Sequence, residues 1–292
     1  MKRRLDRLTR ALPGLEQGDV RALHRVRVAS RRLREIVPVL QLDHASSKRL
    51  TRRLRKLTSR LGTVRELDVM LLGIDEMHAV GRVRSSALAQ VGVAVSKDRD
   101  HARRRLFARL SVNDIWRLAK KLERCVDDLR LAESSSSRTT ARNWKWAVES
   151  RLEHRAVRLA KALHEAGAVY IPERLHVVRI ALKKMRYALE LTTEVAGART
   201  SADLRALMRT QELLGQLHDL QMLVDRVRQV QAALTPPSIP IWRDLDTLIA
   251  SLEDDNRRLH ARYMRMRDQL TSIAERLGGL AAGGAQRARR AG

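Results

Sequence analysis

The stretch that decides the fold reads HRVRVASRRLR, from His24 to Arg34. On a helix, with about 100° between successive residues, an arc of roughly 80° carries one histidine and three cations. These residues are His24, Arg27, Arg31 and Arg34. Apolar residues between Ala22 and Leu40 fall on the opposite side, as expected of a stripe that faces a core. The sequence therefore predicts a helix with one buried apolar face and one cationic face.

The same pattern returns 152 residues later as HVVRIALKKMR, from His176 to Arg186. It repeats the cationic face in register with His176, Arg179, Lys183 and Arg186. Like charges one turn apart destabilise a helix by about 0.2–0.5 kcal/mol per pair. Two copies of such a costly face indicate that it binds a ligand, and that the ligand is anionic.

Further blocks repeat in the same order. LGTVREL, from Leu61 to Leu67, matches LGQLHDL, from Leu214 to Leu220, 153 residues later. Upstream cations match at that same offset, Arg52 with Arg205 and Lys56 with Arg209, and His101 resembles His260 further along the chain. Blocks that recur in constant order indicate an internal duplication.

The composition favours an all-α protein, because Leu, Ala and Arg dominate while Gly and Pro are sparse. We expect two four-helix-bundle-like halves, residues 1–133 and 141–277, joined by a Ser-rich linker at 134–140. Residues 278–292 should form a flexible tail. Asp19 is expected to cap the first cationic helix, which should run to about Leu42 with a kink at Pro38. A pseudo-two-fold between the halves would place both cationic helices on one basic central cleft or channel.

The charge also indicates a polyanionic partner. The 292 residues contain 59 Lys and Arg against 33 Asp and Glu, a net charge of +26. Nucleic acid, an anionic membrane and a phosphate polymer all fit this excess, and solvated surface charge is the plain alternative. Aromatic residues make up only 3% of the chain, which argues against sequence-reading recognition of single strands by base stacking.

Cysteine usage and hydropathy indicate a cytoplasmic protein. Cys125 is the single cysteine, which excludes an intrachain disulfide and favours a reducing compartment. The sequence shows no signal peptide and no run of 18 apolar residues. We therefore expect no membrane association.

The repeated blocks together resemble the CHAD family, the conserved histidine α-helical domain, from about residue 5 to 275. The resemblance implies two four-helix bundles around a basic channel that binds inorganic polyphosphate, and association with polyphosphate granules. By position it assigns to the channel the two cationic faces, with Arg52, Lys56, Arg205 and Arg209 as neighbours and His101 and His260 as additional residues. Arg65 and Glu66 stand where the second copy has His218 and Asp219, so the two copies are not chemically symmetric.

The expected function is binding without catalysis, and no cofactor or metal is expected. Sequence-independent binding of a nucleic-acid backbone is the alternative. A minor alternative is an HD-like metal-dependent phosphohydrolase built on His176, His218, Asp219 and either Asp244 or Asp254. A ring of arginines would repel its metal. Glu66, Asp68 and Asp219 are interpreted as capping groups or as partners that hold basic side chains in place. The histidines should be mostly neutral in the empty site and gain a proton beside phosphate, which predicts tighter binding at mildly acid pH.

Overall fold

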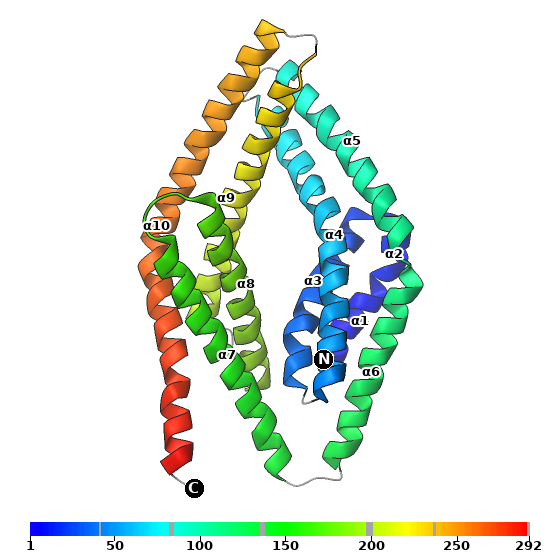
Figure 1. Ribbon diagram of the computed structural model, residues 1–292, viewed down its shortest axis with the longest axis vertical. Coiled ribbons are helices and arrows are strands. Elements are labelled where there is room, and N and C mark those ends of the chain that lie inside the picture. Colours follow the sequence, from blue (N-terminus) through cyan, green and yellow to red (C-terminus); the bar gives the residue numbers. More distant parts are fainter. Residues whose placement is uncertain (41, 82–84, 135–137, 197–200, 236–237, 291–292) are drawn as a thin grey trace. The chain divides into compact units, whose positions relative to one another are not determined.

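The computed structural model describes residues 1–40, 42–81, 85–134, 138–196, 201–235 and 238–290, and every regular element among them is helical (Figure 1). This confirms the predicted all-α class. The elements in chain order are α1 (Lys2–Arg10), α2 (Leu12–Glu16), α3 (Val20–Ile36), the 3₁₀ turn η1 (Val37–Val39), α4 (His44–Ala79), α5 (Ser85–Arg109), α6 (Val112–Ser134), α7 (Arg138–Ala166), α8 (Pro172–Val195), α9 (Ala202–Ala232) and α10 (Ile239–Arg290).

The contacts between residues group the chain into two compact units. The first unit holds Met1–Arg31, Arg52–Leu122 and Leu217–Arg258, and the second holds Arg32–Thr51, Glu123–Gln216 and Leu259–Gly292. Each unit thus combines segments from both predicted halves, because α3, α4, α6, α9 and α10 contribute to both. The pseudo-two-fold, the bundle boundaries and the central cleft stay predictions.

Several helix ends differ from the expectations. The helix that begins near Asp19 ends at Ile36 rather than Leu42, because Pro38 lacks an N–H and the chain continues as the 3₁₀ turn. Four residues of the predicted linker are helical, namely Ser134 and 138–140, and the other three lie outside the described residues. The helix α10 continues to Arg290 through the expected tail, where Ala, Gln and Arg favour helix.

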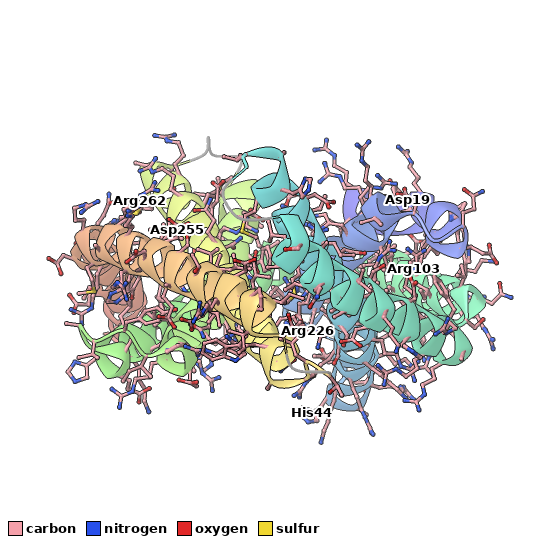
Figure 2. The ribbon with its side chains drawn as sticks, turned by 90° about the horizontal axis from the view of Figure 1, so that it is seen from above. Asp19, His44, Arg103, Arg226, Asp255 and Arg262 are labelled. Atoms are coloured by element: carbon pink, nitrogen blue, oxygen red, sulfur yellow. The ribbon has the colours of Figure 1, made fainter. Side chains whose placement is uncertain are left out.

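The start of α3 is fixed by its cap. The Asp19 carboxylate accepts hydrogen bonds from the backbone N–H groups of Arg21 and Ala22, at 2.8 and 3.1 Å, which confirms the predicted cap. Gly18 precedes it with a φ of 77°, and its carbonyl accepts a 2.6 Å hydrogen bond from Arg103 of α5. A Cβ at Gly18 would lie 2.2 Å from that guanidinium nitrogen, which is the end of a flexible side chain and can move, so it is the backbone conformation that requires glycine there. Figure 2 labels Asp19 and Arg103.

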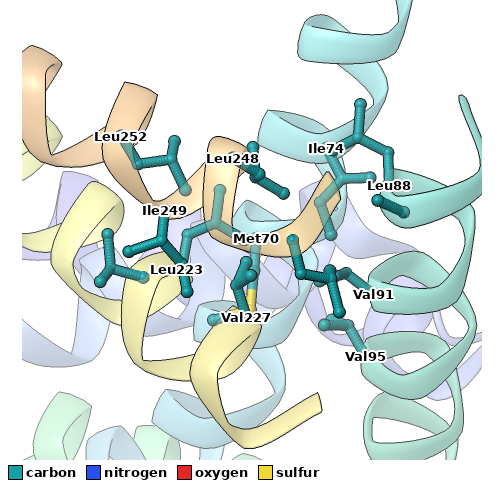
Figure 3. Packing of buried hydrophobic residues seen from close by; sticks show 13 residues of the cluster. Met70, Ile74, Leu88, Val91, Val95, Leu223, Val227, Leu248, Ile249 and Leu252 are labelled. Carbon is teal, nitrogen blue, oxygen red and sulfur yellow. The ribbon is translucent and has the colours of Figure 1, made fainter. Parts of the chain in front are cut away.

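The first unit has an apolar core built from four helices (Figure 3). Met70 and Ile74 of α4 pack with a stripe of α5, from Ala87 to Val95, and with residues of α9 and α10. Burying each such aliphatic side chain contributes about 1.5–3 kcal/mol. Ion pairs join three of these helices, between Arg99 of α5 and Asp68 of α4 at 2.7 Å and between Arg226 of α9 and Asp98 of α5 at 2.6 Å.

In the second unit, α7 and α8 pack against each other. Buried residues recur at three- and four-residue spacing on both helices, as expected of helices that pack along their lengths. They are Val148, Leu152, Ala156, Leu159 and Leu163 on α7, and Leu175, Val178, Leu182, Met185 and Leu189 on α8. Gly167, with a φ of 64°, follows the end of α7, and Pro172 occupies the first turn of α8 as the sequence predicted. This packing directs the cationic face of α8 away from the pair's own core.

Candidate functional site

The cationic face of α3 is set by the contact between α3 and α4 in the first unit. Val26 of α3 is fully buried, and the Ser30 and Thr58 hydroxyl groups hydrogen-bond at 3.0 Å between the two helices. Thr58 is also bonded to the carbonyl of Leu54, 2.8 Å away, so it belongs to a fixed frame. With the apolar side of α3 fixed in this way, His24, Arg27 and Arg31 are carried on its other side.

Two repeated sequence blocks meet at this face. Arg27 of α3 lies 3.6 Å from the Glu66 carboxylate of α4, and a Cβ added at Gly62 would lie 3.9 Å from both groups. Glu66 therefore pairs with a basic side chain, as expected, and so does Asp68 through Arg99. The structure thus brings the His24 block and the Leu61–Leu67 block together, although sequence alone gave no distance between them.

His24 sits in a strongly positive environment. Desolvation of its ring lowers the pKa of His24 from the ordinary value of 6.5, and the nearby charges of Arg65, Arg27, Arg31 and Arg25 lower it further. The neutral imidazole is therefore the favoured form near neutral pH. An anion placed among these arginines would reverse that balance.

The corresponding face in the second unit lies on α8. His176, Arg179 and Lys183 are half-buried, and Arg186 is buried at 8% exposed. Arg186 donates hydrogen bonds to Gln211 and Glu190, and its guanidinium carbon lies 4.5 Å from the centre of the Tyr187 ring. Its donors thus serve contacts inside the protein, which gives Arg186 a structural role in addition to the predicted binding role.

A second cationic group in this unit contains Arg34, which the sequence predicts as a binding residue, and other cations that the sequence analysis did not single out. Glu35 of α3 is 3% exposed, and its carboxylate accepts hydrogen bonds from Arg151 and Arg155 of α7 at 2.7 and 2.9 Å. Three further cations surround them, namely Arg34, Arg158 and Lys184. We call these six residues the Glu35 cluster. Desolvation and the neighbouring arginines lower the pKa of Lys184, and desolvation lowers that of Arg151, as expected where positive charge exceeds negative.

A sequence signal for this cluster exists on α7. Arg151, Arg155 and Arg158 recur at four- and three-residue spacing, beside the buried stripe that contains Leu152 and Leu159. The duplicated blocks do not point to it, because α7 carries no copy of them.

The other predicted residues occupy varied positions. Arg52, Arg205 and Arg209 are exposed on their helices, and His101 of α5 is exposed beside Arg104, with 3.2 Å between their nitrogens. Lys56 lies about 160° around α4 from Thr58, the residue that contacts α3. It lines a pocket against α6 instead of joining the cationic face of α3.

His260 has mainly aromatic neighbours. Its ring lies 5.2 Å from that of Tyr170 and 6.1 Å from that of Tyr263, centre to centre. Burial lowers the pKa of His260 and raises that of Tyr263 to about 12. These contacts give His260 a packing role in the second unit.

Among the residues that the structure describes, no group of three or more His, Cys, Asp or Glu is arranged to hold a metal ion. No helix in the described ranges is both long and apolar enough to cross a bilayer. Among the described residues, both units contain a group in which cations outnumber carboxylates: four arginines with Glu66 and Asp19 near His24, and five cations around Glu35.

Comparison with known families is consistent with this arrangement. The model of the CHAD domain matches residues 1–228. This chain belongs to the CHAD family. The match includes both histidine blocks and both Leu-Gly blocks from which the resemblance was drawn. Among curated proteins, none matches the sequence.

Two solved structures share the fold of this CHAD protein. The crystal structure of the CHAD domain from the plant Ricinus communis has a TM-score of 0.60 and 22% identity, with 88% of each chain covered. PptA from Streptomyces chartreusis has a TM-score of 0.58 and 15% identity, with 90% of this chain and 94% of that chain covered. At these identities the comparison establishes the fold.

Proposed function

We propose that this protein binds inorganic polyphosphate, without catalysis, through the cationic faces of α3 and α8 and the Glu35 cluster. The observation that carries the proposal is the excess of cations at each place. Four arginines near His24 share two carboxylates, since Arg27 pairs with Glu66 and Arg25 with Asp19, and five cations surround Glu35. A chain of regularly spaced phosphates supplies the missing negative charge.

Arginine suits this ligand better than it suits a generic anion. Its planar guanidinium stays charged and donates two parallel hydrogen bonds to phosphate oxygens. Each charge-assisted contact contributes about 1.5–3 kcal/mol before the costs of association. Membership of the CHAD family supports the same ligand, since the motifs that define the resemblance lie on these faces.

The protein is proposed to act in the cytoplasm, on polyphosphate that includes the polymer of granules. Nucleic-acid backbone is the competing ligand, because it too presents a row of phosphates. Competition between long-chain polyphosphate and duplex DNA for the labelled protein separates the two. Displacement of polyphosphate by equimolar phosphate units of DNA would favour nucleic acid.

The direct test is a titration with polyphosphates of several lengths. The double variant Arg27→Ala/Arg179→Ala removes one arginine from each cationic face, and we expect its affinity for long chains to fall at least tenfold, about 1.4 kcal/mol. Arg10→Ala/Arg262→Ala is the matched control, since both residues are exposed, one in each unit, and the charge change is equal. Equal losses in the two double variants, with helicity intact, would mean that affinity follows net charge and would overturn the assignment.

A further inference from the structure

A pocket lies between α4 and α6 in the first unit, apart from the contact of α4 with α3. It has a volume of about 380 Å³, which falls in the range of small-molecule sites. Arg53, Lys56 and Arg60 of α4 line one side. They lie about 140–160° around the helix from Thr58, so the pocket opens on a different side of α4 from the cationic face of α3.

The charged rim of this pocket is strongly positive. Four cations, Arg53, Lys56, Arg60 and Arg117, share it with one carboxylate, Asp114. Asp114 is already paired with Arg117 at 3.0 Å, and Arg60 is held by a 2.6 Å hydrogen bond to the carbonyl of Arg109. Arg53 and Lys56 are exposed and have no carboxylate partner among the described residues, so at least two positive charges remain for a ligand.

The floor is apolar, which distinguishes this pocket from the polyphosphate faces. It is formed by Leu57 of α4, Leu110 at the turn after α5, and Ile115 and Leu118 of α6. Polyphosphate has no apolar part, so these side chains add nothing to its binding. A ligand that joins several negative charges to a flat, weakly polar body uses both the rim and the floor.

We propose that the α4–α6 pocket binds a nucleoside di- or triphosphate, with the phosphates at Arg53 and Lys56 and the base against the Leu57–Leu118 floor. The pocket volume lies in the range of sites that hold one small molecule. This inference is independent of the proposed polyphosphate function, because the residues that carry it come from another side of α4 and from α6.

Calorimetric titration of the Arg27→Ala/Arg179→Ala variant, in which the polyphosphate faces are weakened, tests the proposal with ATP, tripolyphosphate and adenosine at equal ionic strength and without divalent cations. We expect ATP to bind at least about fivefold more tightly than tripolyphosphate, because only ATP contacts the floor, and adenosine to bind far more weakly than either. Equal affinities for ATP and tripolyphosphate would overturn the proposal.

Variants then locate the ATP. Arg53→Ala/Lys56→Ala should weaken ATP binding at least about fivefold, whereas Arg55→Ala/Lys120→Ala should change it less than about twofold. Arg55 and Lys120 are the matched control, since they are exposed on the same two helices outside the pocket. Equal losses of ATP affinity in the two double variants would overturn the assignment of ATP to this pocket. A loss confined to Arg27→Ala/Arg179→Ala would also overturn it, by placing ATP on the polyphosphate faces, and would leave the proposed function intact.

Discussion

At the scale of single residues, some cations are held by a buried carboxylate and others lie on the predicted cationic faces. Arg151 and Arg155 are fixed by the buried Glu35, whereas Arg31 is half-buried on α3 near His24. One carboxylate among several arginines fixes the positions of the guanidinium groups that it pairs with, but it neutralises only one of their positive charges. The Glu35 cluster therefore keeps a net positive charge while its geometry is set by the protein.

Glu35→Gln should destabilise the protein, because the substitution leaves Arg151 and Arg155 partly buried without their counter-charge. We expect a loss of about 2 kcal/mol in the free energy of unfolding, less than for a fully buried pair since both arginines are partly exposed. Urea denaturation measures it. Glu165→Gln, which breaks an exposed pair with Lys161, is the control and should cost under about 0.5 kcal/mol. Equal losses would remove the structural role assigned to Glu35.

His24 predicts how binding depends on pH. Its pKa is lowered in the free protein, and a phosphate among the arginines would raise it, so binding takes up a proton. Polyphosphate should therefore bind about threefold more tightly at pH 6 than at pH 8 at matched salt. The stability of the free protein depends on pH in the opposite direction. The histidine of the unfolded chain takes up a proton near pH 6.5, whereas His24 in the folded protein has a lower pKa. The free energy of unfolding therefore falls as the pH drops through 6.5.

The measurement is a pair of titrations at the two pH values for the unchanged protein and for His24→Gln. The variant should show a smaller affinity ratio between pH 6 and pH 8. His164→Gln, at an exposed position near the end of α7, should keep the original ratio. An unchanged ratio in His24→Gln would assign the proton uptake to another group.

At the scale of elements, periodic packing decides where the cationic faces point. Leu182 is fully buried on α8 and Val177 is 52% exposed, although both lie within one helix of alternating apolar and basic residues. Leu182→Ala should cost about 2–4 kcal/mol through lost burial and the cavity left behind. Val177→Ala should cost under about 0.5 kcal/mol. Thermal or urea unfolding measures both, and similar values would contradict the packing of α8.

The helices could be predicted where local chemistry fixes them. Asp19 and Pro172 mark helix starts because capping and the proline ring act within one turn. Where two local effects compete, the sequence was less informative: Pro38 ended α3 rather than kinking it, and the glycines after residue 277 did not end α10. The sequence does not predict which side chains of different helices lie close together, so the pairing of Glu35 with Arg151 and Arg155 could not be predicted from it.

At the scale of the whole molecule, binding should be sensitive to salt, because a chain with a net charge of +26 contacts a polyanion. Each phosphate neutralised by a cation releases condensed counterions, so log K should fall linearly with log salt concentration. For a flexible phosphate chain we take the single-strand coefficient, about −0.7 per contact. Removing one arginine from each cationic face should therefore make the slope shallower by about 1.4. Titrations between 50 and about 300 mM salt measure it, and an identical slope in Arg27→Ala/Arg179→Ala would show that these arginines do not contact the polymer.

The same charge predicts that polyphosphate stabilises the fold. Repulsion among the cations opposes the compact state, and a polymer that binds only the folded chain shifts the equilibrium by RT ln(1 + [L]/Kd), about 2.7 kcal/mol at one hundred times Kd. We therefore expect the melting temperature to rise by several degrees with saturating long-chain polyphosphate. Monophosphate at the same total phosphate concentration is the control, because it screens charge without bridging neighbouring cations. An equal rise in melting temperature with both ligands would mean that screening alone relieves the repulsion. An unchanged melting temperature with both would contradict the proposal that polyphosphate binds the folded protein.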